Sequence, residues 1–232
     1  MLMDRRCFAQ ACTGALLAQG LPAWATAMQD YAHVKLVHPD GTPLKAAQVG
    51  TQEALVFAYP LKGIPCYLIN LGDRRVATQE LTSPDDGSYT NPEGVGPASS
   101  LVAFVAVCTH QLSYPTPAAS YLRYAASGSE LGGGPGRIVC CAHGSVYDPA
   151  QGGARVTGPT QNPLMPVRLA WDPATDQLTA TGTVGQKFFE RFFQNFKADL
   201  IEQYGPGVYR QEVEGSVVAV PLSAYSKAVP AC

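Results

Sequence analysis

Two short motifs in this sequence combine cysteine with histidine. The first reads CTH (108–110), and the second reads CCAH (140–143). Together they offer two thiolates and two imidazoles. Such a set can hold zinc, or a two-iron cluster in which two cysteines bind one iron and two histidines bind the other. Because consecutive side chains of an extended chain point to opposite sides, Cys140 and Cys141 are not expected to bind the same metal.

The residues around the motifs narrow the choice of metal. The second motif continues into GSVYD (144–148), and GPTQNP (158–163) follows later in the chain. With these runs the sequence resembles the Rieske iron–sulfur proteins. The resemblance is to the high-potential branch found in cytochrome bc-type complexes and in the small subunit of arsenite oxidase, and it covers roughly residues 100–182.

The resemblance implies a Rieske [2Fe–2S] cluster with four protein ligands. Cys108 and Cys140 would bind the buried iron, and His110 and His143 would bind the outer iron and form the edge through which electrons pass. Neutral imidazoles leave the site less negative than four thiolates would, which raises its reduction potential. The resemblance also implies imidazoles that lose protons when the cluster is oxidised, which suits oxidation of a quinol.

Two further residues match the high-potential pattern. In the family, a serine at the position of Ser145 donates to a bridging sulfide, and a tyrosine at the position of Tyr147 donates to a cysteine sulfur. Donors aimed at sulfur stabilise the reduced, more negative cluster. The alternative is that both hydroxyls only satisfy nearby backbone groups in a turn.

The sequence departs from the family pattern in three ways. The two cysteines that usually form a disulfide between the ligand loops are replaced by Ser113 and Ala142. Gln111 stands where a leucine usually contributes to docking at the quinol site. The motifs are also unusually far apart, and residues 116–136 are expected to form an excursion beside the cluster.

Five of the seven cysteines are not assigned to the cluster. Cys7 and Cys12 lie in the N-terminal segment, and Cys66, Cys141 and Cys232 remain. An odd remainder leaves one free thiol or one pairing between chains. A bridge between Cys66 and Cys232 would tie the tail to the core, but the sequence alone does not decide the pairing.

The composition and the strand pattern predict a mostly β protein. Glycine (23) and proline (19) are frequent, and only 15% of the residues are charged. Short apolar segments alternate with turns, as in a turn-rich β protein. The expected fold is the Rieske fold, in which antiparallel sheets carry a small cluster-binding subdomain. The segments expected as strands are 31–38, 53–60, 66–72, 101–108, 136–140, 165–182 (a hairpin) and 216–221, while 74–100 is expected to be a polar connection.

One amphipathic helix is expected over residues 186–205. Apolar residues recur there at three- and four-residue spacing, and Gly205-Pro206 ends the pattern. The helix is expected to pack on the β core, with docking to a membrane or a partner subunit as the alternative.

The chain is expected to divide into three parts. Residues 1–27 resemble a twin-arginine export signal, either cleaved or retained as a membrane anchor, and this predicts a periplasmic protein. Residues 28–183 would form the Rieske domain, with the cluster-binding part at about 100–164, and residues 184–232 would form a helix and tail. The net charge of -2 argues against nucleic acid as a partner.

The expected function is one-electron transfer in a periplasmic respiratory chain. The favoured setting is the iron–sulfur subunit of a quinol:cytochrome c oxidoreductase, with a cytochrome b subunit, quinol and a cytochrome c-type acceptor as partners. The alternative is an electron-relay subunit of another periplasmic oxidoreductase, such as an arsenite-oxidase-like enzyme with a molybdoenzyme large subunit.

Two other classes fit the sequence less well. A Rieske oxygenase component needs a second iron site, and only His33 and His38 remain for it. A zinc-stabilised binding module is the non-redox alternative.

Overall fold

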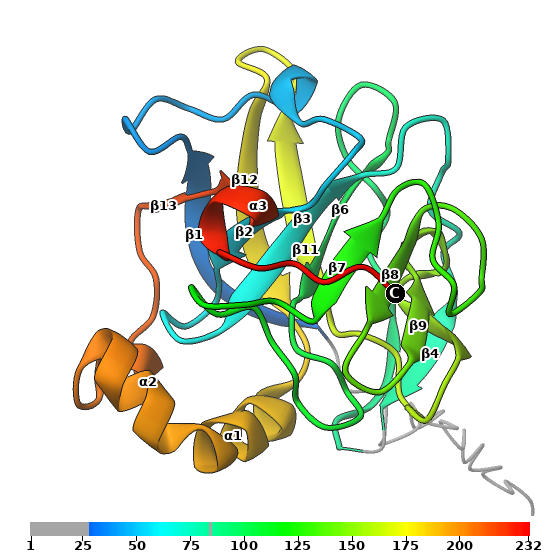
Figure 1. Ribbon diagram of the computed structural model, residues 1–232. Coiled ribbons are helices and arrows are strands. Elements are labelled where there is room, and N and C mark those ends of the chain that lie inside the picture. The colour runs from blue at the N-terminus through cyan, green and yellow to red at the C-terminus, as the bar shows by residue number, and fades with distance from the viewer. Residues whose placement is uncertain (1–27, 84) are drawn as a thin grey trace, which may run out of the picture.

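The protein folds as a mostly β structure with helices near the C-terminus, as a computed structural model of residues 28–83 and 85–232 shows (Figure 1). This confirms the expected mostly β class. The strands are β1 (Gln29–Val37), β2 (Leu55–Ala58), β3 (Pro65–Asn70), β4 (Glu80–Ser83), β5 (Gly87–Thr90), β6 (Leu101–Val105), β7 (Leu122–Ala125), β8 (Arg137–Cys140), β9 (Ser145–Asp148), β10 (Ala154–Thr157), β11 (Pro166–Asp172), β12 (Gln177–Thr183), β13 (Ser216–Val218) and β14 (Val220–Pro221). The helices are α1 (Gln186–Asn195), α2 (Lys197–Tyr204) and α3 (Leu222–Tyr225), with short 3-10 turns η1 (Ala46–Gln48), η2 (Pro149–Gln151) and η3 (Val208–Arg210).

An eight-stranded sheet forms the base of the molecule, in the order β13-β1-β12-β11-β6-β3-β2-β14. Its neighbours pair antiparallel except β1 and β13, which are parallel. The two edge strands, β13 and β14, are separated in the chain only by Ala219. One continuous segment therefore borders both edges, and the sheet closes on itself.

A smaller four-stranded sheet, in the order β10-β9-β8-β7, lies beside β6 (Figure 1). It carries the second cysteine–histidine motif between β8 and β9. Its strands β7, β9 and β10 belong to segments whose sequences are too short and too mixed to be recognised as strands. β7 and β9 pair with β8, whose apolar residues predict a strand, and β10 pairs with β9.

A two-stranded hairpin, β4 and β5, lies inside the segment 74–100, which was expected to be only a polar connection. That expectation was wrong. The hairpin faces solvent with residues such as Thr82 and Ser88, which hydrogen-bond across it at 2.9 Å, and it buries Tyr89 against the core. The sequence did not predict these strands because the segment is polar and only one large side chain of the hairpin, that of Tyr89, is buried.

Strand alternation divides the core into two apolar clusters. In β3, Cys66 and Leu68 enter the cluster inside the closed sheet, while Tyr67 and Ile69 enter a second cluster between the two sheets. Because side chains alternate along a strand, one buried strand can serve both layers. The second cluster joins the small sheet to the base.

The helical segment contains two helices rather than the expected single one. The break is at Phe196, with φ −114° and ψ 23°, between α1 and α2. Phe196 leaves helical geometry there and packs edge-on against Tyr114, with ring centroids 4.9 Å apart. Four phenylalanines of α1 are fully buried in the base cluster, which agrees with a helix packed on the core: Phe188, Phe189, Phe192 and Phe193.

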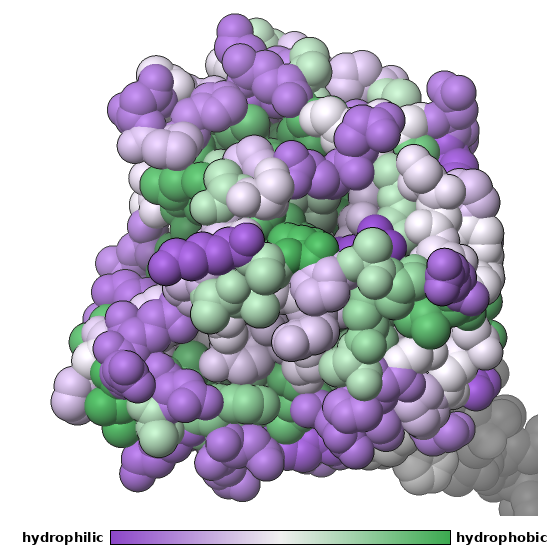
Figure 2. All heavy atoms as spheres, viewed as in Figure 1, coloured by the Kyte–Doolittle hydropathy of each residue, from purple (hydrophilic) through white to green (hydrophobic). Residues whose placement is uncertain are grey.

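The face that carries the C-terminal tail is mostly polar, with apolar residues exposed in the hollows between polar side chains (Figure 2). Among the helices of the described ranges, none is both long and apolar enough to cross a membrane. The predicted export signal or anchor at 1–27 lies outside the described residues.

Candidate metal centre

The four predicted ligands lie on two loops that face each other between the sheets. Cys108 follows β6, and Cys140 ends β8. Both thiols are fully buried, whereas His110 is half-buried and His143 is exposed. The arrangement therefore has a buried sulfur side and an accessible imidazole side.

Strand alternation explains why these two cysteines meet. The side chain of Cys108 lies on the same side of the chain as those of the even-numbered residues of β6, such as Phe104. This side faces the small sheet. Cys140 shares its side of β8 with Ile138, which faces the base. Cys141 lies on the opposite side of the small sheet, at the cluster formed around Val139. The adjacent cysteines thus point apart, as the sequence predicted.

The two buried thiols interact directly. The Cys140 thiol hydrogen-bonds to Cys108, which holds the pKa of Cys108 below its ordinary value and raises that of Cys140. The backbone N–H of His110 also points at the Cys108 sulfur, and those of Ala142 and His143 point at Cys140. Amide donors aimed at sulfur favour thiolates, the form that binds metal.

The two imidazoles lie next to each other at the edge of the site. The rings of His110 and His143 are 5.1 Å apart between centroids and inclined at 79°. His110 Nδ1 is buried and has no hydrogen-bond partner among the described residues. A buried nitrogen lone pair is costly unless it finds a ligand.

Each ligand loop is closed by its own backbone. In the first loop, Cys108 N–H donates to Ser113 O at 2.8 Å, and Leu112 N–H donates to Cys108 O at 2.9 Å. In the second, Gly144 N–H donates to Cys140 O at 2.8 Å, with Gly144 at φ 78°. These turns bring each histidine back over its cysteine.

The glycine–proline loop packs directly onto the second ligand loop. A Cβ on Gly158 would lie 2.1 Å from the carbonyl oxygen of Gly144 and 2.6 Å from Ser145 Cα. Only glycine allows this approach, at φ 91°. The contact explains why the loop at 158–163 accompanies the motif in the sequence.

A network of hydroxyl groups surrounds the Cys108 sulfur. Tyr147 Oη lies 3.2 Å from Cys108 Sγ, accepts from Thr109 N–H at 3.2 Å, and lies 3.0 Å from Thr109 Oγ1. Thr109 Oγ1 is in turn 2.7 Å from Thr160 Oγ1. Burial and the neighbouring sulfur raise the pKa of Tyr147, so its hydroxyl keeps the proton that it can donate. The sequence singled out Tyr147 but neither threonine, although both lie within the matching motifs.

Ser145 lies at the start of β9 and is fully buried. Its hydroxyl has no hydrogen-bond partner among the described residues. It is near enough to Cys108 to contribute to the lowered pKa of that thiol. The Ser145 hydroxyl could donate to an acceptor bound beside the two thiols, such as a ligand of the site.

The donor set fits a two-iron cluster. Within the described ranges, no three histidine, cysteine, aspartate or glutamate side chains converge on a single metal position. A two-iron cluster does not need such convergence, because each iron takes two protein ligands. Two adjacent buried thiols and two adjacent imidazoles fit this requirement, as do the unpartnered atoms of His110 and Ser145.

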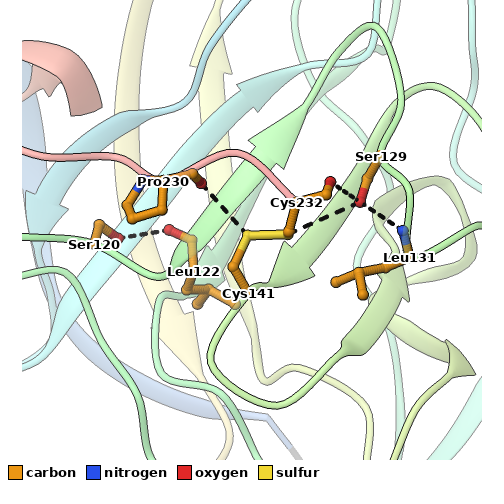
Figure 3. The surroundings of a disulfide bond; sticks show 7 residues. All are labelled: Ser120, Leu122, Ser129, Leu131, Cys141, Pro230 and Cys232. Atoms are coloured by element: carbon orange, nitrogen blue, oxygen red, sulfur yellow. Dashed lines mark hydrogen bonds between the residues drawn. A yellow bond between two sulfur atoms is a disulfide. The ribbon is translucent and has the colours of Figure 1, made fainter.

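The cysteine pairing differs from the bridge considered between Cys66 and Cys232. Cys141 forms a disulfide with Cys232 (Figure 3). Cys66 is a buried free thiol that donates to Tyr59 O at 3.0 Å. The bridge to Cys66 was wrong because strand alternation places Cys66 inside the closed sheet, away from the tail. The side chain of Cys141 lies on the outer face of the small sheet, beside the C-terminal residue Cys232.

The chain matches no protein-family model, but it is similar to solved structures. The chain is similar to the soluble domain of the Rieske protein II (soxF) from Sulfolobus acidocaldarius. The two are 26% identical, the match covers 66% of this chain and 78% of that chain, and the TM-score is 0.47.

Proposed function

We propose that the protein binds a Rieske [2Fe–2S] cluster and transfers single electrons through it. The observation that carries this proposal is the pairing of two buried, interacting thiols with two adjacent imidazoles at the edge of the same site. The cluster would supply a one-electron redox couple. Cys108 and Cys140 would hold it as thiolates, and His110 and His143 would hold it from the exposed side.

The protein's own residues would then tune and shield the centre. The backbone N–H groups aimed at Cys108 and Cys140, together with the Tyr147 hydroxyl, stabilise negative charge on sulfur and so favour the reduced state. Burial of the thiols keeps water from that side. The exposed His143 leaves a short path for an electron to a docked partner.

The setting we propose is a periplasmic quinol:cytochrome c oxidoreductase of the bc type. Its support is the resemblance of the ligand motifs to the high-potential branch and of the N-terminal segment to an export signal. Partners would be a cytochrome b subunit, quinol and a cytochrome c-type acceptor. A relay subunit beside a periplasmic molybdoenzyme is the second candidate, favoured by Gln111 and by the lack of paired cysteines at positions 113 and 142.

The cluster is tested by analysis of the native protein as isolated. We expect about two irons and two acid-labile sulfides per chain, a coloured protein, and a rhombic EPR spectrum on reduction. Cys108→Ser and Cys140→Ser are expected to lose the iron, whereas Cys66→Ala, a buried thiol outside the site, should keep it. A colourless, zinc-loaded native protein would overturn the proposal.

The setting is tested by co-purification from membranes and from the periplasm separately. Recovery with a cytochrome b supports the bc-type role. Recovery with a molybdoenzyme supports the relay role and overturns the bc-type role.

A further inference from the structure

The last residues of the chain form a strap along the excursion between the two motifs. After α3, Lys227 N–H donates to Pro117 O at 3.0 Å and Ala228 N–H to Ala118 O at 3.2 Å, while Ser120 N–H donates back to Ala228 O at 2.9 Å. The strap, residues 226–232, crosses from α3 to the end of β8 (Figure 1). It therefore adds backbone pairing to residues 117–120, which precede β7 and lie in no strand.

The strap ends on the second ligand loop. Cys232 is joined by the disulfide to Cys141, the residue directly after the ligand Cys140 (Figure 3). The carbonyl oxygen of Cys232 accepts from Ser129 Oγ at 2.5 Å and from Glu130 N–H at 3.1 Å. One residue thus ties the ligand loop and the far part of the excursion together.

The excursion holds the same loop from the other side. Cys141 N–H donates to Tyr121 O at 2.7 Å, and Tyr121 directly follows the segment that the strap pairs with. Cys141 is therefore fixed through its backbone by the excursion and through its side chain by the chain end. His143, two residues on, is exposed.

The first ligand loop is also held by the C-terminal region. Tyr114 follows the CTH motif, and its ring lies edge-on to both Phe192 and Phe196, with centroid distances of 4.9 Å in each case. Phe192 is fully buried in the base. Residues 186–232 thus contact both loops that carry the ligands.

We propose that the C-terminal strap, through the Cys141–Cys232 disulfide, positions the second ligand loop at the metal centre. It fixes His143 and prevents the loop from opening away from Cys108. Within the described ranges this is the one disulfide. The first loop is held by aromatic packing, while the second is held covalently by the tail. The effect on the centre rests on the proposed cluster, but the effect on the loop does not.

The test compares the wild-type protein with Cys141→Ser/Cys232→Ser and with Cys66→Ala, which removes a cysteine outside the strap. We expect the double variant to lose its iron to a chelator about tenfold faster, because local opening of the loop is no longer restrained. We also expect a changed EPR spectrum and a shifted midpoint potential, which a loss of global stability alone would not produce. Cys66→Ala should match the wild type in the spectrum and the potential.

Hydrogen exchange of the iron-free proteins separates this inference from the proposed function. Residues 116–120 and 140–144 should exchange faster in the double variant, whether or not the native protein binds iron. If the double variant does not fold, mild treatment of the folded wild type with a dithiol opens the same bond and permits the same measurements. Unchanged exchange, chelator loss and EPR spectrum after opening of the disulfide would overturn the role of the strap. Absence of iron from the native protein would overturn the proposed function instead.

Discussion

The closed eight-stranded sheet and the four-stranded sheet are stabilised in different ways. The base buries large side chains from nearly all of its strands, together with the phenylalanines of α1. The outer cluster of the small sheet is built from Ala125, Val139 and Val146, with Leu131 and the disulfide packed beside them. The inner face of the small sheet packs in the second cluster, which it shares with the base, but its outer face depends less on apolar burial.

Specific bonds add to apolar burial in the small sheet. Asp148 at the end of β9 pairs with Arg74 at 2.7 Å and with Arg137 at 3.2 Å, and it accepts from Ala150 N–H at 2.9 Å. The Tyr147 hydroxyl network lies on the inner side of the same sheet, and the disulfide lies on its outer side. Directional bonds fix positions more closely than apolar contact does, which is what ligand loops require.

The largest effect is expected from a cavity in the base. Leu36 lies in β1 and is fully buried. Leu36→Ala should lower the free energy of unfolding by about 2–5 kcal/mol, since a buried leucine leaves both lost burial and a cavity. Denaturant unfolding measures this, and the EPR spectrum of the folded fraction should stay that of the wild type. Val218→Ala, an exposed position on the neighbouring β13, is the control. A changed EPR spectrum in Leu36→Ala would show that the two regions are not separable.

A smaller loss of stability, with an effect on the metal centre, is expected from Asp148→Asn. The change removes the negative charge that two arginines share, and Arg137 remains mostly buried. We expect a loss of about 1–3 kcal/mol, together with faster loss of iron to a chelator. The control is Asp30→Asn, which breaks an exposed pair with Arg168 on the base and should leave both measurements unchanged. Equal effects of the two variants would contradict the contrast between the regions.

The hydroxyl at Cys108 should affect potential rather than stability of the fold. Tyr147→Phe removes a donor that lies 3.2 Å from Cys108 Sγ. A hydrogen bond worth about 1 kcal/mol corresponds to about 40 mV for a one-electron couple, so the midpoint potential should fall by about that amount. Tyr89→Phe is the matched control, a buried tyrosine whose hydroxyl lies away from the ligands. A potential that is equal in Tyr147→Phe and the wild type would exclude this hydroxyl as a tuning group.

The contrast between the regions also explains what the sequence could predict. Short apolar segments predicted strands at β1, β3, β6 and β8, and placed Cys108 and Cys140 at the ends of two of them. The disulfide partner of Cys141 could not be predicted, because the two cysteines are 91 residues apart and meet only through the path of the tail. The helix break at Phe196 was hidden for a similar reason, since it depends on contact with Tyr114 from a distant loop.

The smallest effect is expected at the far end of the hydroxyl network. Thr160 Oγ1 lies 2.7 Å from Thr109 Oγ1, which lies 3.0 Å from Tyr147 Oη, so Thr160 reaches Cys108 only through two other hydroxyls. Polarisation along such a chain is worth a fraction of one hydrogen bond. Thr160→Val should therefore lower the midpoint potential by less than Tyr147→Phe does, and Thr160→Ser, which keeps the hydroxyl, should restore it. If Thr160→Val and Thr160→Ser shift the potential equally, the shape of the loop at 158–163 matters there rather than the hydroxyl. In that case, the chain of hydroxyl hydrogen bonds that affects the potential would extend from Cys108 only as far as Tyr147.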